Sequence, residues 1–238
     1  MANQPFEFKH FSIHQDKTAM KVGTDGVLLG AWTEIDPEVF SILDIGAGTG
    51  VISLMMAQRC QAELIDAIEL NDEAYEQTVE NFERSDWGDR LFCYHASLKE
   101  FQDEIEDKYD LIISNPPFYT STYKELPVDR AMARHTESLP FNELLYGVSK
   151  LLAKKGSSSF IIPFSEEGNF ILIAEENNLY PNRITRVKGN QNTPFKRSLI
   201  QFSFVEGEIV ESELIIEEDR HKYTPEYSEL VEDFYLRM

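Results

Sequence analysis

The stretch Ser41-Ile42-Leu43-Asp44-Ile45-Gly46-Ala47-Gly48-Thr49-Gly50 joins an apolar strand pattern to a glycine-rich turn. Residues 51–58 follow it with the pattern of a helix, so the segment predicts a strand, a tight turn and a helix in that order. Glycine reaches positive φ and lets another group approach the backbone closely, while the first turn of a helix leaves N–H groups unpaired. We therefore expect a ligand to lie against this turn.

The spacing of the glycines separates two classes of ligand. A dinucleotide-binding turn has a small residue three positions after its second glycine, and here Val51 occupies that position. The pattern is instead G-x-G-x-G after Asp44, and a loop of that shape resembles the S-adenosylmethionine (SAM) loop, whose ligand has no pyrophosphate. Glu69 lies near the end of the next apolar stretch, where a carboxylate can accept hydrogen bonds from both ribose hydroxyls.

A second unusual strand end lies at Asn115-Pro116-Pro117-Phe118, directly after the apolar residues 109–114. Proline cannot donate to a β-ladder and fixes its own φ, so the pair ends the strand and holds a carbonyl still. An amide oxygen, a rigid C=O and a ring face suit a planar –NH2 group on a flat π-system, because they offer two acceptors and a stacking surface. A plain strand-ending turn is the alternative for these four residues taken alone.

Strand and helix patterns alternate along most of the chain, which predicts an α/β fold with right-handed crossovers and helices on both faces of the sheet. The expected strands are 41–46, 62–69, 90–95, 109–114, 156–162, 181–188 and 196–205, and the expected helices are 50–59, 71–86, 97–105, 140–153, 166–177 and 225–237. About seven residues join the last two strands, too few for a crossover helix, so the last strand of a mostly parallel seven-stranded sheet should be antiparallel.

We expect a single domain of residues 1–238, with an N-terminal extension (1–40), a core (41–205) and a C-terminal strand and helix (206–238). The 238 residues, 42% hydrophobic and 27% charged, are typical of a globular domain. The chain has no apolar run of membrane-spanning length and no signal peptide, and Cys60 and Cys93 have no C-x-x-C partner. We therefore expect a cytoplasmic protein with reduced core cysteines, no membrane and, from the histidine spacing, no metal.

Several segments of the chain resemble those of a known enzyme family. Residues 41–205 resemble class I, Rossmann-like SAM-dependent methyltransferases, whose sheet is parallel except for an antiparallel seventh strand. Nearly the whole chain resembles the bacterial methyltransferases that modify N6 of the adenine just 3′ of the anticodon of valine tRNA. The segments that carry this resemblance are FSIHQDKTAMKVGTDGVLLGAW (11–32), LDIGAGTG (43–50), DAIEL (66–70), DLIISNPPF (110–118), Ala133-Arg134-His135-Thr136 and YTPEYSELVEDFYLRM (223–238).

The resemblance implies SAM as the cofactor and tRNA as the substrate of a monomeric enzyme, with no DNA partner. Patterns and resemblance together assign cofactor binding to Thr24, Asp25, Asp44, Gly46, Gly48, Gly50, Glu69, Ser97 and Asn115, and catalysis to Asn115, Pro116, Pro117 and Phe118. Asp25 has the alternative of a simple turn residue. Related enzymes usually place an acidic residue, which accepts from the SAM adenine, at the end of the third strand. Here Ser97 or the backbone would substitute for it.

The net charge of −20 has the wrong sign for a protein that wraps a polyanion. The acids gather in the expected helix 71–86 and in a tail at 211–219, whereas the bases gather near 9–21, 130–135 and 183–197. For a tRNA substrate, the bases must converge on the face that holds Asn115, with the acids on the far side. The residues expected to bind substrate are Arg130, Arg134, Lys196 and Arg197.

Three alternatives use the same motif or fold. Protein-glutamine methyltransferases acting on a release factor also carry Asn-Pro-Pro, since a glutamine amide is also a flat –NH2 group, but residues 1–40 are too short for their helical N-terminal domain. DNA adenine methyltransferases normally need a target-reading domain, for which this chain has little room. A non-catalytic SAM-binding module is the third alternative, and the intact Asn115-Pro116-Pro117-Phe118 argues against it.

Overall fold

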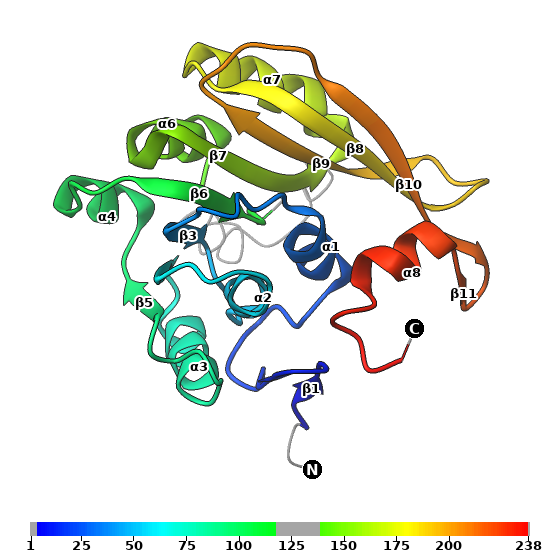
Figure 1. Cartoon of the computed structure of the whole chain (residues 1–238), viewed down its shortest axis with the longest axis horizontal. Coiled ribbons are helices and arrows are strands. Elements are labelled where there is room, and N and C mark those ends of the chain that lie inside the picture. Colours follow the sequence, from blue (N-terminus) through cyan, green and yellow to red (C-terminus); the bar gives the residue numbers. More distant parts are fainter. Residues whose placement is uncertain (1–3, 118–138, 238) are drawn as a thin grey trace, which may run out of the picture.

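A computed structural model describes residues 4–117 and 139–237 (Figure 1). Within these ranges, one sheet of nine strands has the order β11-β10-β8-β9-β7-β6-β3-β4-β5. Its strands are β3 (Ser41–Ile45), β4 (Leu64–Glu69), β5 (Leu91–His95), β6 (Tyr109–Ser114), β7 (Leu152–Pro163), β8 (Tyr180–Asn190), β9 (Phe195–Ser203), β10 (Val210–Asp219) and β11 (Lys222–Tyr223).

The pairing within β3 to β9 confirms the predicted Rossmann-like sheet. Strands β5, β4, β3, β6 and β7 pair in parallel, and β9 is antiparallel to both of its neighbours, β7 and β8. The predicted count of seven is corrected, because β10 adds to β8 in parallel and β11 adds to β10. Residues 211–219 are therefore not a solvated tail: buried Leu214 anchors them as a strand of the sheet.

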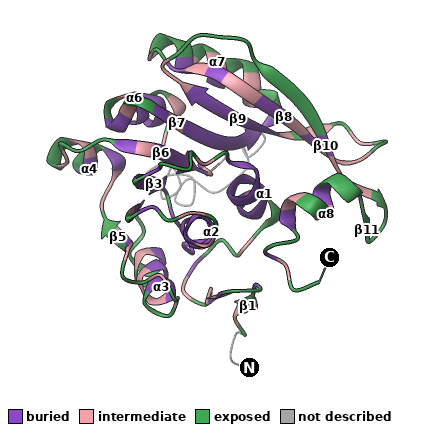
Figure 2. Ribbon diagram, in the orientation of Figure 1, coloured by how far each residue is buried: buried purple, intermediate pink, exposed green. Residues whose placement is uncertain are grey.

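Helices cover both faces of the sheet, as predicted. They are α1 (Thr24–Trp32), α2 (Val51–Arg59), α3 (Asp72–Glu83), α4 (Leu98–Glu104), α6 (Phe141–Leu151), α7 (Glu167–Glu176) and α8 (Pro225–Val231), with a 3-10 turn η2 (Phe164–Glu166) before α7. One hydrophobic cluster joins the sheet to α1, α2 and α8, and a second joins the opposite face to α4, α6 and α7. Figure 2 shows β7 and β9 buried between these layers, whereas the outer strand β10 is largely exposed.

The N-terminal extension is more ordered than a simple turn. A hairpin of β1 (Phe6–Glu7) and β2 (Ser12–Ile13) packs beside the C-terminal segment, where Lys9 N donates to Phe234 O at 2.8 Å. Thr24 and Asp25 do not lie in a turn: they begin α1, whose residues 26–32 are buried. Gly30 permits this packing, since a Cβ there would lie 2.6 Å from Met55 Sδ of α2.

The structure corrects the expected end of the C-terminal helix and the expected burial of the two cysteines. The C-terminal helix ends at Val231 and not at residue 237, and Phe234 and Tyr235 pack after it as separate contacts. Cys60 and Cys93 are free but only half-buried, so they border the core. None of the helices in the described ranges has the length and apolar run needed to cross a membrane.

Candidate active site

The carboxyl edge of the sheet brings the two sequence motifs together. Strands β4, β3 and β6 pair side by side up to one shared row of residues. The next residue along the chain is Glu69 in β4, Gly46 after β3 and Asn115 after β6. Neighbouring strands lie about 5 Å apart, so the glycine turn starts between the carboxylate and the amide. A ligand lying across the tip of β3 would meet all three residues, which is where open α/β sheets bind their ligands.

Three glycines in the turn adopt positive φ, but they serve two different purposes. Gly46 (φ 77°) and Gly48 (φ 61°) border open space, because a Cβ on either would have no atom within 4 Å. Gly50 (φ 77°) instead lies against α3, and a Cβ there would be 2.7 Å from Phe82 Cε1. The first two glycines therefore leave room for a ligand, and the third lets α3 pack on the turn.

Glu69 joins the glycine turn to the start of α3 through its two carboxylate oxygens. Its Oε2 accepts from Gly48 N at 2.8 Å and its Oε1 accepts from Asn71 N at 2.9 Å. Each carboxylate oxygen has a second acceptor direction, so ribose hydroxyls can still bond to it. The position of Glu69 is compatible with its predicted role.

Asp44 lies beneath the turn, almost fully buried in β3. Its Oδ2 accepts from Ser53 Oγ of α2 at 2.7 Å, while Oδ1 has no hydrogen-bond partner in the part of the chain that the structure describes. Burial raises the pKa of Asp44 to about 6, and the nearby charge of Glu69 adds to the rise. Asp44 thus supports the turn from below, with one acceptor left for a donor at the site.

Thr24 and Asp25 lie beside residues that the sequence predicts to bind substrate. Asp25 Oδ2 accepts from Arg197 Nε of β9 at 2.7 Å, so this ion pair ties the start of α1 to the carboxyl edge. Thr24, Asp25, Lys196 and Arg197 line one groove of about 250 Å³. The predicted cofactor and substrate residues therefore meet there, and Arg197 reaches the groove already paired with Asp25.

Ser97 has a clear local role at the start of α4. Its Oγ accepts from Glu100 N at 3.2 Å, and Glu100 Oε2 accepts from Ser97 N at 2.9 Å, which completes a capping box; Oγ also donates to Glu100 Oε2 at 2.7 Å. The hydroxyl is thus already engaged, and its contact with an adenine stays a prediction. Of the residues predicted to act in catalysis, Pro116 is buried, Asn115 and Pro117 are half-buried, and Phe118 lies outside the described residues. Arg130 and Arg134, predicted to bind substrate, also lie outside them.

The expected separation of bases from acids is wrong. Because β10 lies beside β8, Arg186 pairs with Glu211 at 2.9 Å and Lys188 with Glu213 at 3.4 Å. Other bases are also paired with acids, among them Lys17 with Glu76 and Glu80, Arg183 with Glu34, and Arg186 with Glu167. Lys196 is exposed and, within the described ranges, has no acidic partner.

Sequence reasoning missed three buried polar residues of α3. Gln77, Thr78 and Asn81 face inward, and Thr78 and Asn81 donate to the carbonyls of the glycine turn. The signal was available: these polar side chains recur at helical spacing on a face that is distinct from the acidic one. Their uncharged side chains distinguished a buried hydrogen-bonding face from the solvated acidic face.

Comparison with known proteins agrees with this geometry. The family profile described as "Methyltransferase small domain" matches residues 26–139. A protein of Christiangramia forsetii is 59% identical over 240 residues, covering 100% of both chains, and one of Flavobacterium johnsoniae is 57% identical, covering 98% of this chain and 100% of its own. A solved predicted O-methyltransferase from Agrobacterium tumefaciens has a TM-score of 0.69 at 20% identity, over 88% of this chain and 96% of its own, a likeness of fold.

The sheet order, the glycine turn and these matches define a class I SAM-dependent methyltransferase, and SAM is its cofactor. The open space beside Gly46 and Gly48, the carboxylate of Glu69 and the orphaned Asp44 Oδ1 fit such a ligand. Both full-length relatives are named tRNA1(Val) (adenine(37)-N6)-methyltransferase, and the chain belongs to that family.

The two kinds of glycine should respond differently to a methyl group. We expect Gly50→Ala to lower the free energy of unfolding by about 2–4 kcal/mol, because strain at positive φ adds to the clash with Phe82. Gly48→Ala should cost only about 1 kcal/mol but should weaken SAM binding by about tenfold or more. Urea unfolding and calorimetry with SAM separate the two effects, and equal losses of stability in both variants would contradict the assignment.

The raised pKa of Asp44 predicts a pH-dependent stability. The folded pKa of about 6 lies above the ordinary value of 3.8, so the folded state binds more protons and stability falls as pH rises between these values. Asp44→Asn cannot titrate. The stability of Asp44→Asn relative to wild type should therefore rise by about 2 kcal/mol between about pH 4.5 and about pH 7.5. Urea unfolding at the two pH values checks this, and a difference independent of pH would refute it.

Proposed function

We propose that this protein methylates N6 of an adenine in tRNA, namely adenine 37 of a valine tRNA, at the strand end Asn115-Pro116-Pro117. The placement of Asn115 directly beside the glycine turn carries the proposal, because it sets an amide acceptor next to the cofactor site. The names of the full-length relatives support the choice of tRNA.

The proposed chemistry uses an aryl amine as the nucleophile. SAM would supply the methyl group from its positively charged sulfur, which leaves as a neutral thioether when the S–C bond breaks and the N–C bond forms; the methylated nitrogen would then lose one proton to solvent. The lone pair of adenine N6 is delocalised into the ring, and two acceptors, Asn115 Oδ1 and the Pro116 carbonyl, would bind its two hydrogens and direct the lone pair out of that conjugation. The same acceptors would stabilise the positive charge that develops on nitrogen, because they are held in place before the reaction.

Rigid positioning of these acceptors follows from the local structure. Ser114, at the end of β6, donates from Oγ to Ile45 O of β3 at 2.8 Å and so ties the strand end to the glycine-turn strand. Pro116 is buried, its ring fixes its φ, and the following Pro117 restricts its ψ, so its carbonyl has little freedom. Phe118 would stack on a base swung out of its loop, a role that stays a prediction.

A glutamine in a protein is the alternative acceptor, because its amide also presents two hydrogens on a planar nitrogen. Within the described ranges, residues 4–32 form a small hairpin and a helix that pack on the core and on the C-terminal segment. They do not form a separate helical domain that could hold a release factor. Together with the names of the relatives, this favours tRNA over the protein substrate.

The tRNA would approach at the carboxyl edge beyond β7. Phe164 follows β7 directly, and its ring centroid lies 5.3 Å from that of Phe195 at the start of β9. Lys188 Nζ lies 5.1 Å from the centroid of the Phe195 ring. Lys196 is exposed beside them. Aromatic faces combined with cations are typical of sites for unpaired nucleotides. We therefore place the nucleotides that flank the target adenine on this edge.

Asn115→Ala tests the proposed acceptor. We expect normal SAM affinity, because the amide is assigned to the substrate amine, and a loss of turnover on tRNA of about a hundredfold to a thousandfold. Labelled SAM with tRNA, a release-factor protein or duplex DNA, followed by nucleoside mass spectrometry, identifies the product. Wild-type turnover in Asn115→Ala would disprove the acceptor role, and labelling of only the protein would replace tRNA as the substrate.

Lys196→Glu tests the approach of tRNA at this edge, with Lys155→Glu as a matched control. Both lysines are exposed, but Lys155 lies near the start of β7, at the opposite edge of the sheet. We expect Lys196→Glu to raise the KM for tRNA about fivefold to tenfold by repelling phosphate, and Lys155→Glu to change it less than about twofold. Equal effects of the two reversals would show that only the net charge matters.

A further inference from the structure

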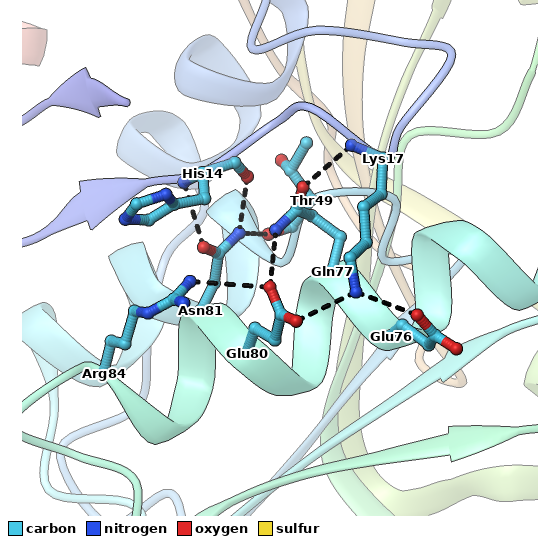
Figure 3. A network of polar contacts seen from close by, with 8 residues as sticks. All are labelled: His14, Lys17, Thr49, Glu76, Gln77, Glu80, Asn81 and Arg84. Carbon is cyan, nitrogen blue, oxygen red and sulfur yellow. Dashed lines mark hydrogen bonds and ion pairs between the residues drawn. The ribbon is translucent and has the colours of Figure 1, made fainter. Parts of the chain in front are cut away.

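The segment between the β1–β2 hairpin and α1 is bonded to α3 by buried side chains. We call residues 14–22 the strap (Figure 3). Asn81 Oδ1 accepts from His14 N at 2.9 Å, and Asn81 Nδ2 donates to His14 O at 2.9 Å. One helical turn earlier, Gln77 Oε1 accepts from Lys17 N at 3.0 Å. Backbone groups of the strap are thus paired with side chains more than fifty residues away.

The same face of α3 also holds the glycine turn. Asn81 Nδ2 donates to Thr49 O at 2.9 Å as well, and Thr78 Oγ1 donates to Gly48 O at 3.0 Å. Asn81 is 1% exposed and Thr78 is fully buried, so water cannot replace either bond. Losing one partner would leave a buried polar group unsatisfied, which destabilises the arrangement of the turn.

The side-chain amide of Asn81 therefore connects the glycine turn to the strap. The Gly48 and Thr49 carbonyls bond to α3, while Gly48 N bonds to Glu69 at the strand tip. The strap leads directly into Thr24 and Asp25, whose pairing with Arg197 fixes the start of α1 at the same edge. A shift of Asn81 would disturb the turn and the strap together.

We propose that the strap docks in concert with SAM binding, and that Asn81 and Gln77 are the positioning residues that couple the two. A ligand that favours one arrangement of the glycine turn also favours the arrangement of Asn81 that binds His14. The coupling is reciprocal, so a docked strap raises the affinity for SAM. This inference concerns the cofactor side of the established methyltransferase class and does not depend on the choice of tRNA.

The exposed ion pairs on the strap supply a matched control. Lys17 Nζ lies 2.8 Å from Glu76 Oε2 and 2.9 Å from Glu80 Oε1, and these hydrogen bonds raise the pKa of Lys17. Exposed pairs of this kind contribute little in salt. Lys17→Met therefore removes a strap contact while leaving the bonds of Gln77 and Asn81 in place.

The experiment compares Gln77→Met, Asn81→Ala and Lys17→Met with the wild type. SAM affinity is measured by calorimetry, stability by urea unfolding without SAM, and docking by hydrogen exchange of the strap amides with and without SAM. In the wild type, SAM should slow exchange at His14 and Lys17, whose amides bond to Asn81 and Gln77. Gln77→Met, which loses the strap bond and a long contact of 3.5 Å to Glu80 but no bond to the glycine turn, should bind SAM about fivefold more weakly or worse and should lose this protection.

Lys17→Met should keep SAM affinity within about twofold of wild type and keep the protection. A merely structural role would lower stability in urea but leave the effect of SAM on strap exchange unchanged, which would overturn the proposal. Wild-type strap exchange unaffected by SAM would also overturn it. If Asn81→Ala does not fold, the SAM affinity and strap exchange of Gln77→Met alone test the proposal. Methylation of tRNA by the wild type tests the proposed function separately.

Discussion

The packing of α3 against the glycine turn is the contact on which the cofactor site depends. Gly50 has positive φ and no side chain, so the Phe82 ring can approach to 2.7 Å from the position that a Cβ would take. This closeness lets Thr78 and Asn81 reach the carbonyls of Gly48 and Thr49. A turn rich in glycine loses much conformational entropy on folding, and these buried bonds offset that loss by fixing a single arrangement.

The charge distribution follows from the added strand β10. An acidic strand paired in parallel with a basic one, β8, places carboxylates beside guanidinium and ammonium groups across the ladder, as in Arg186 with Glu211 and Lys188 with Glu213. Much of the positive charge near the carboxyl edge is therefore compensated locally. A polyanion would meet a surface of mixed sign, which favours recognition through shape and stacking over broad electrostatic attraction.

The N-terminal extension completes the site and does not form a separate unit. Its helix α1 packs on α2 through Gly30 and begins at the groove that contains Arg197, and its strap bonds to α3. The proposed cofactor site therefore depends on the glycine turn, α3 and the extension, three segments that are distant in the sequence. Their joint packing gives Thr78, Asn81 and the carbonyls of Gly48 and Thr49 their hydrogen-bond partners.

The sequence by itself determined the α/β fold, the carboxyl-edge position of the glycine turn, and the strand end at Asn115, because local periodicity and the special geometry of glycine and proline act over a few residues. It could not give the ion pairs of β8 with β10, the capping use of Ser97 or the bonds of Asn81 to His14 and Thr49. These depend on which segments become neighbours after the sheet and its helices have packed. Sequence patterns place a side chain on one face of its own element, whereas its partner is decided only by tertiary structure.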